Sequence, residues 1–161
     1  MTTTGHERDI VATFPPTADE PPDTRDRLDA RRERRPGAVV LSPRGEVDAY
    51  TQHRWCRLLD DAARRLGPGD QLIVDLRELT FLSCRALEDL AVRAQRCHAA
   101  GGRLLVVADQ PWLIRVSRAI GLDEWLPVAT RVPAGPADVV APASPGRACV
   151  PRRPPRADSR R

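Results

Sequence analysis

The distribution of proline constrains the fold of this chain more than any other feature. The 161 residues contain 16 prolines, and only those at positions 43, 68, 111 and 127 fall between residues 37 and 132. Because proline fixes φ and removes a backbone hydrogen-bond donor, regular elements are favoured where it is scarce. We therefore predict one ordered domain at residues 37–132. Residues 1–36 are predicted to be mostly disordered, and residues 133–161 to form a disordered Pro/Arg-rich tail.

The net charge of +4 is carried by the predicted tail. All 26 basic residues are arginine, and the tail holds six of them against two aspartates, which gives +4. Residues 1–36 sum to −1, so the predicted domain has a charge of +1. A nearly neutral domain lacks the basic surface that nucleic-acid recognition needs, and we expect no specific nucleic acid as a partner. The tail is expected to be solvated, with contact to nucleic acid or an anionic membrane as the alternative.

No membrane or export signal is visible in the sequence. Apolar runs are shorter than the roughly 20 residues that span a bilayer, and the first residues lack the basic-then-apolar order of a signal peptide. The cysteines at 56, 84, 97 and 149 form no CxxC pair and no recognisable disulfide framework. We therefore expect a cytoplasmic protein with free thiols and no membrane partner.

The spacing of apolar residues alternates between strand and helix periods within the predicted domain. In chain order it predicts strands at 38–41, 71–76, 103–108 and within 125–132, separated by helices at 50–66, 84–99 and 111–120. This alternation is typical of an α/β fold with a mainly parallel sheet and crossover helices. We predict a single domain with four or five strands.

Two further segments affect where the first predicted strand ends and whether another strand precedes it. Pro43 and Gly45 follow the first strand, and they predict that it ends soon after residue 41, because a proline removes a donor from a strand ladder. Residues 27–35 alternate charges and have little to bury. Either a weak edge strand or a short charged helix fits that segment.

The sequence contains no recognisable motif for catalysis or metal binding. No phosphate-binding glycine loop occurs. His53 with Cys56, and Cys97 with His98, are the only metal-ligand pairs, and both cysteines lie near apolar helix faces, so we expect no metal and no cofactor. Cys84 begins a predicted helix, a position where a thiol can be reactive, but neither histidine can be placed beside it. We therefore expect no catalytic residue and no enzyme.

Five short motifs follow one another across residues 38–130. They are Gly45-Glu46-Val47-Asp48, Leu72–Leu76, Leu79–Leu82, Gly101–Val107 and Ile120–Leu126. Together they resemble the STAS domain of bacterial anti-sigma factor antagonists. The resemblance implies a protein that binds an anti-sigma factor, often a serine kinase of the histidine-kinase-like ATPase type, and so frees a sigma factor. It also implies a switch, in which phosphorylation of a serine at the start of the second helix breaks the complex.

This chain departs from the family pattern at that switch. The family usually reads Phe-hydrophobic-Asp-Ser-Ser-Gly-Leu, and its second serine accepts the phosphate, whereas residues 81–87 read Phe-Leu-Ser-Cys-Arg-Ala-Leu. Arg85 stands in the phosphoacceptor position and Cys84 replaces the other serine. Ser83 is the remaining hydroxyl, but it lies two positions early and is predicted to be the N-cap of the helix. The usual phospho-switch is therefore not expected.

The resemblance implies a partner-binding surface made of Asp48, Ser83, Cys84 and Arg85. Asp48 matches the binding-face aspartate of the family, although an aspartate after a strand is also an ordinary turn residue, and a capped helix start is an equally ordinary reading of Ser83. We expect a regulator of the anti-sigma factor antagonist type that is locked in one state. The alternatives are a diverged STAS scaffold for other proteins, including a homodimer, and a redox sensor that uses Cys84.

Overall fold

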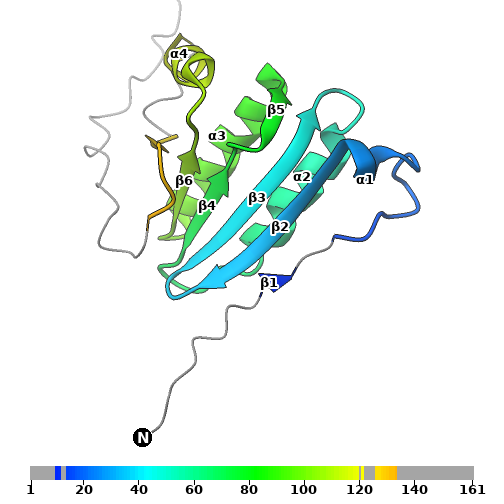
Figure 1. Ribbon diagram of the computed structural model, residues 1–161. Coiled ribbons are helices and arrows are strands. Elements are labelled where there is room, and N and C mark those ends of the chain that lie inside the picture. The colour runs from blue at the N-terminus through cyan, green and yellow to red at the C-terminus, as the bar shows by residue number, and fades with distance from the viewer. Residues whose placement is uncertain (1–9, 12–13, 120, 122–125, 134–161) are drawn as a thin grey trace, which may run out of the picture.

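A mixed β-sheet of seven strands runs through the residues that the computed structural model describes, which are 10–11, 14–119, 121 and 126–133 (Figure 1). The strands are β1 (Ile10–Val11), β2 (Leu28–Arg35), β3 (Ala38–Val47), β4 (Gln71–Asp75), β5 (Leu79–Leu82), β6 (Arg103–Val107) and β7 (Val128–Ala129). The helices are α1 (Thr24–Arg27), α2 (Gln52–Ala63), α3 (Cys84–Ala99) and α4 (Pro111–Ala119). The order across the sheet is β1-β2-β3-β4-β6-β7, and β5 pairs with β3.

The pairing of the strands confirms the predicted α/β fold with a mainly parallel sheet. Strand β3 is parallel to β4 and β5, β4 is parallel to β6, and β6 is parallel to β7. The pairs β1–β2 and β2–β3 are antiparallel. The described residues form seven strands and not the four or five expected, because β1 and β5, with two and four residues, are too short to show a periodic pattern.

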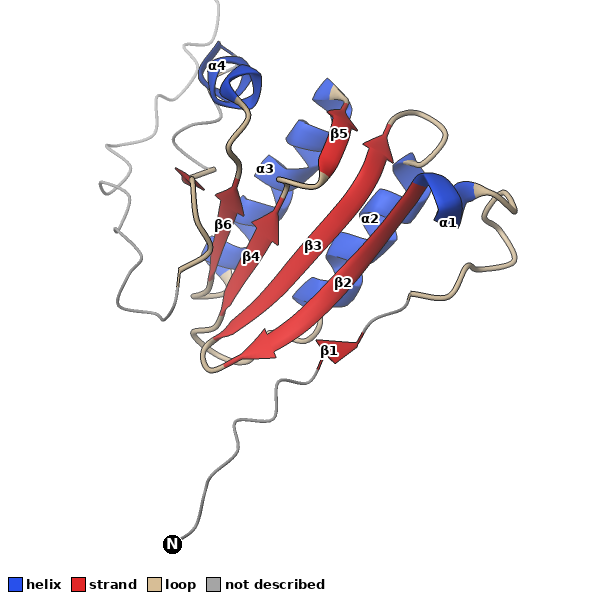
Figure 2. Cartoon of the chain, in the orientation of Figure 1, coloured by secondary structure: helices blue, strands red, loops and turns tan. Residues whose placement is uncertain are grey.

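Helices α2 and α3 cover one face of the sheet (Figure 2). The main core lies between them and the sheet, and its largest members include Trp55, Leu58 and Leu59 of α2 and Leu90 of α3. A smaller apolar cluster lies on the other face, formed by Ala38, Val40, Ile73, Leu105 and Val107, with Ala129 and Val132 packed against it. The central strands β4 and β6 are therefore buried on both faces, as their continuous apolar runs predict.

Residues 28–35, for which a strand and a helix were both open, form β2. This strand lies between β1 and β3 in the sheet, so it is not an edge strand. Its alternate residues Leu28, Ala30 and Arg32 are buried. Arg32 is tolerated on that face because it pairs with Asp61 and its guanidinium lies 5.4 Å from the centre of the Phe14 ring.

Among the side chains that the structure describes, the first buried one is Phe14, well before the predicted domain start at residue 37. Phe14 and Glu20 are buried. The guanidinium of Arg54, which is fully buried in α2, donates hydrogen bonds to the carbonyls of Leu28 (2.6 Å) and Phe14 (2.9 Å) and to the carboxylate of Glu20 (2.9 Å). These hydrogen bonds hold residues 14–28 against α2.

Much of the predicted disorder falls outside the described residues. Residues 1–9 and 12–13 lie outside them, as does nearly all of the predicted tail, from 134 to 161.

Strand β3 continues through Pro43 to Val47, so the prediction that it ends near residue 41 is wrong. Its pairing with β4 ends at Leu41, and its pairing with β5 begins at Gly45. The amide of Gly45 donates to the carbonyl of Glu78, on the β5 side. The nitrogen of Pro43, two residues earlier, faces the same side. Because neither β4 nor β5 pairs with β3 at that point, the missing donor removes no ladder bond.

The pairing of β3 with β5 contains a bulge, because its register shifts between Gly45 and Glu46. Gly45 is paired with Leu79, but Glu46 is paired with Phe81, so Thr80 is an extra residue in β5. The hydroxyl of Thr80 donates to the carbonyl of Gly45 (3.0 Å). An inserted residue changes which face the following side chain points to, and Leu79 and Leu82 are both buried while Thr80 and Phe81 are exposed.

Replacing Gly45 with alanine is expected to destabilise the protein severely. Gly45 has a φ of +106°, and a Cβ atom there would overlap with the carbonyl oxygen of Arg27. Gly69 offers a matched control, because its φ is also positive, at +77°, but an added Cβ atom there would meet no other atom within 4 Å. We expect Gly69→Ala to cost about 1 kcal/mol through strain alone and Gly45→Ala about 3 kcal/mol or more, measured by urea unfolding. Equal costs would contradict the overlap.

Replacing Glu20 with glutamine is expected to cost about 3 kcal/mol at neutral pH, because it removes the fully buried counter-charge of Arg54 and leaves only the longer contact with Asp29 (3.3 Å). Burial raises the pKa of Glu20, but the hydrogen bonds and charges of Arg57 and Arg54 outweigh it and hold the pKa below the ordinary value of 4.5. The ionised carboxylate therefore stabilises the fold fully above that value, and this contribution is lost as the pH falls through the folded-state pKa.

The measurement is urea unfolding of both proteins from pH 7 down to pH 3. The difference between Glu20→Gln and the unsubstituted protein should shrink in the acidic range. Glu78→Gln is the control, since Glu78 pairs with Arg31 on the surface, with side chains 53% and 59% exposed, and its loss should cost less than about 1 kcal/mol. A pH-independent difference for Glu20→Gln would refute the assigned role of the carboxylate.

Candidate protein-docking site

The four residues predicted to bind a partner follow two strand ends that lie side by side. Val47, the last residue of β3, is paired with Leu82 of β5, and the amide of Ser83 donates to the carbonyl of Val47 (2.9 Å). Figure 2 shows β3 and β5 pointing in the same direction. Asp48 and Ser83 are thus the first residues after adjacent strand ends. We call the surface formed by Asp48, Ser83, Cys84 and Arg85 the strand-end surface.

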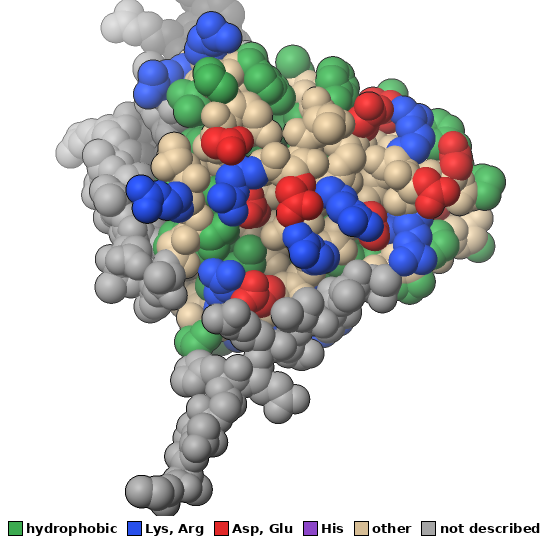
Figure 3. All heavy atoms as spheres, viewed as in Figure 1, with side chains coloured by type: hydrophobic (Ala, Val, Ile, Leu, Met, Phe, Trp, Pro, Cys, Tyr) green, Lys and Arg blue, Asp and Glu red, His purple; other side chains and the backbone are tan. Residues whose placement is uncertain are grey.

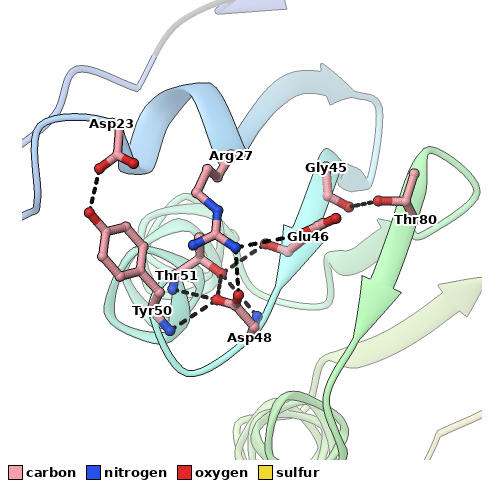
Figure 4. A network of polar contacts seen from close by, with 8 residues as sticks. All are labelled: Asp23, Arg27, Gly45, Glu46, Asp48, Tyr50, Thr51 and Thr80. Atoms are coloured by element: carbon pink, nitrogen blue, oxygen red, sulfur yellow. Dashed lines mark hydrogen bonds and ion pairs between the residues drawn. The ribbon is translucent and has the colours of Figure 1, made fainter.

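Asp48 closes the turn between β3 and α2 (Figure 4). Its Oδ1 accepts hydrogen bonds from the amides of Tyr50 (2.9 Å) and Thr51 (3.0 Å), and its own amide donates to the Thr51 hydroxyl (3.0 Å). That hydroxyl donates in turn to the carbonyl of Glu46 (2.8 Å). An aspartate that accepts from the amides ahead of it is a common way to stabilise a turn, so Asp48 does act as a turn residue here.

Arg27, at the end of α1, binds the same carboxylate. Its Nη2 lies 2.8 Å from Oδ2 of Asp48 and 3.4 Å from Oε2 of Glu46. Its guanidinium carbon lies 5.0 Å from the centre of the Tyr50 ring, and the Tyr50 hydroxyl donates to Asp23 (Figure 4). The sequence analysis missed Arg27 and Tyr50, because nothing in the polar, proline-rich N-terminal segment indicates that it folds back onto this turn.

The environment of Asp48 favours its charged form. The hydrogen bond from the Thr51 amide contributes most to a pKa below the ordinary value for this carboxyl, and the Thr51 hydroxyl, the charge of Arg27 and the Tyr50 amide add to it against the effect of burial. A carboxylate that accepts several hydrogen bonds and faces a guanidinium stays ionised well into the acidic range. Asp48 therefore presents a fixed, paired charge.

Ser83 caps α3, as the sequence predicted. Its backbone is extended, and its Oγ accepts a hydrogen bond from the amide of Ala86 (3.2 Å). The next two residues, Cys84 and Arg85, are exposed. Arg85 has no hydrogen-bond or ion-pair partner among the described residues. Its charge at the start of α3 is therefore free to meet another molecule.

Exposed apolar side chains lie next to the strand-end surface. The described residues include three large hydrophobic side chains that are exposed, namely Tyr50 (41%), Phe81 (49%) and Val92 (43%). Tyr50 is two residues from Asp48, and Phe81 is two residues from Ser83, turned outward by the bulge in β5. Exposed apolar groups surrounded by polar ones are typical of protein interaction sites.

The open face of the sheet has a different character. Figure 3 shows arginine and acidic side chains mixed across it. Ion pairs of residues in this region include Arg44–Asp29 (3.5 Å) between β3 and β2, Arg31–Glu78 (2.7 Å) between β2 and the residue before β5, and Arg35–Glu33 (2.9 Å) within β2. Paired charges of both signs give no one-sign field over this face.

The cysteines and histidines do not form a metal site in the described part of the chain, where no three His, Cys, Asp or Glu residues gather around a common point. Cys56 contacts Asp89 (3.5 Å), and burial together with that carboxylate raises the pKa of its thiol. Burial also raises the pKa of Cys97. Cys149 lies outside the described residues. None of the described helices is both long and apolar enough to span a bilayer.

Sequence comparison places the strand-end surface within a known domain. The pattern of the STAS domain matches residues 29–134. A "putative anti-anti-sigma factor Rv2638" of Mycobacterium tuberculosis is 37% identical over 91 residues, which cover 56% of this chain and 62% of the relative. The "anti-sigma-F factor antagonist RsfA" of the same species is 35% identical over 91 residues, which cover 56% of this chain and 71% of the relative. The matched segment is thus less than two thirds of the first relative's length.

Structural comparison agrees. The crystal structure of an anti-sigma factor antagonist from Mycobacterium paratuberculosis has a TM-score of 0.59 and 26% identity, covering 70% of this chain and 92% of that chain. The unphosphorylated form of the anti-sigma factor antagonist SpoIIAA shares the fold, with a TM-score of 0.51, 20% identity and coverage of 63% of this chain and 88% of that chain. The chain belongs to the STAS domain family.

Proposed function

We propose that this protein is an anti-sigma factor antagonist that binds an anti-sigma factor through the strand-end surface. The observation that carries this proposal is the junction of β3 and β5, where the Ser83–Val47 hydrogen bond holds the start of α3 beside the Asp48 turn. The names of the relatives support the class of partner. A bound anti-sigma factor would no longer hold its sigma factor, as the resemblance to the family implies.

The role is one of binding and not of catalysis. Tyr50 and Phe81 offer apolar contact area next to the polar groups of the strand-end surface, and interfaces commonly combine a few such anchors with a polar rim. The partner class extends to serine kinases of the histidine-kinase-like ATPase type, because the resemblance implies that many anti-sigma factors belong to it. A cytoplasmic location fits this role.

We further propose that the protein lacks the phospho-switch of its family. Arg85 occupies the phosphoacceptor position on the first turn of α3 and is exposed, and a guanidinium cannot accept phosphate from a serine kinase. Phosphorylation acts at such a surface by adding about two negative charges, whereas Arg85 holds a permanent positive charge there. Ser83 is only partly exposed and its Oγ is engaged as the helix cap. The antagonist would therefore remain able to bind whatever the kinase activity.

Binding should depend on the apolar anchor beside the strand-end surface. We expect Phe81→Ala to weaken binding to the anti-sigma factor about tenfold, since a half-exposed aromatic at an interface contributes more than 1 kcal/mol, measured by titration calorimetry. Val92→Ala is the matched control, because Val92 is similarly exposed but lies about 12 Å further along α3. Equal losses in both variants would argue against this surface. Failure to bind any anti-sigma factor, with other proteins captured instead, would favour the scaffold alternative.

The absence of a switch predicts that the purified protein takes up no phosphate from the cell's anti-sigma kinases and ATP, as judged by intact-mass spectrometry. Arg85→Ser restores a hydroxyl at the family's position, and we expect it to become phosphorylated and then to lose affinity for its partner. Ser83→Ala serves as the control and should lose about 1 kcal/mol of stability with the cap but leave the phosphorylation result unchanged. Stoichiometric phosphate on Ser83 of the unsubstituted protein would overturn the locked state.

A further inference from the structure

Residues 14–28 precede the matched STAS segment, which begins at residue 29, yet they reach the strand-end surface. Figure 1 shows α1 beside the end of β3, at the loop that leads into α2. The segment is not a loose extension in this region. It contributes the buried residues Phe14, Glu20 and Thr24, and an attachment this firm makes it part of the folded domain.

Buried charges hold the segment in one position. The side chains of Arg54 and Glu20 are both fully buried and lie 2.9 Å apart, and Arg57 binds the other oxygen of Glu20 at 2.8 Å. A buried ion pair fixes geometry, because any displacement leaves an unpaired charge away from water. The carbonyl of Arg27 also packs directly against Gly45. Two sets of contacts therefore fix the position of α1 relative to β3: the ion pairs of Glu20 with α2, and the packing of the Arg27 carbonyl against Gly45.

The anchored segment orients an exposed aromatic ring next to Asp48. Tyr50 is 41% exposed, but its hydroxyl is held by Asp23 and one face of its ring by the guanidinium of Arg27 (Figure 4). A ring fixed in advance loses little conformational freedom when a partner covers it. Tyrosine and arginine are also, with tryptophan, enriched at the energetic centres of interfaces.

Arg27 keeps hydrogen-bonding capacity after its internal contacts are made. Only its Nη2 is engaged, with Asp48 and Glu46, so among the described residues its Nε and Nη1 groups have no partner, and its side chain is 37% exposed. These donors suit a carboxylate or carbonyl oxygen. The pair formed by Arg27 and Tyr50 thus fits a partner segment that carries an apolar side chain next to an acidic one.

We propose that Arg27 and Tyr50 form a second contact region for the anti-sigma factor and determine which anti-sigma factor binds. This inference rests on the function proposed above. The strand-end surface supplies the contact that the resemblance to the family implies, and the segment at residues 14–28 adds Arg27, which precedes the family match, and orients Tyr50, which lies within it. An anti-sigma factor with an apolar and an acidic side chain opposite this region binds more tightly than one without them.

The test measures the affinities of two anti-sigma factors from the same bacterium, the tightest binder and the next one, by titration calorimetry. We expect Tyr50→Ala to weaken the tightest complex at least tenfold and the other less than threefold. Arg27→Lys keeps the charge that faces Asp48 but loses the planar donor group, and should act in the same direction. Arg25→Lys, on the same helix, is the control and should change neither affinity more than twofold.

A photoreactive amino acid in place of the exposed Asp26 gives a second readout that does not depend on Tyr50 or Arg27. It should crosslink to the tightest-binding factor, whereas the same group in place of Arg64, beyond the far end of α2, should not. Equal weakening of both complexes would overturn the selectivity, and unchanged affinities without a crosslink at position 26 would overturn the contact. Binding by the unsubstituted protein to no anti-sigma factor would instead remove the function proposed above, and this inference with it.

Discussion

The buried pair of Arg54 and Glu20 is the interaction on which the rest of the structure depends. A guanidinium without access to water must have its donors satisfied, and the donors of Arg54 bind the carboxylates of Glu20 and Asp29 and the carbonyls of Phe14 and Leu28. Helix α2 can therefore bury Arg54 only when the N-terminal segment is folded against it. That segment places α1, and α1 places the side chains around Asp48. A single charge in α2 thus links the core to the surface where we propose that a partner binds.

The sequence predicted the elements whose stability is local or periodic. The apolar face of α2, with Trp55, Leu58 and Leu59, and the continuous apolar runs of β4 and β6 are visible without tertiary information, and so is the cap at Ser83. The short elements β1, β5 and α1 are not, because two to four residues carry no period. The burial of Arg54 could not be predicted either, since in sequence it resembles any surface arginine of a helix, and only its partners within residues 14–29 explain that burial.

The candidate site was predictable in part for the same reason. The resemblance to the STAS domain placed Asp48 and Ser83 on one surface, whereas their direct adjacency depends on the pairing of β3 with β5, which the sequence did not predict. The exposure of Phe81 depends on the bulge at Thr80, and no feature of the local sequence predicts that bulge. Arg85 is the informative departure. The resemblance to the family implies a reversible charge at this position, and we propose that the permanent charge of opposite sign on Arg85 makes the contact constitutive.

The division of β3 between two partners has a consequence for how such a domain can diversify. Its first four residues are paired with β4, in the interior of the sheet, and its last three residues with β5, at the end that carries the strand-end surface. Between them, around Pro43, the strand is held on the β2 side alone. We therefore expect changes in β5 or in the turn at Asp48 to disturb the pairing of β3 with β4 less than changes nearer that pairing. The inner strands can thus stay constant over evolutionary time while the strand-end surface changes, which under the proposed function would adapt the domain to a new target.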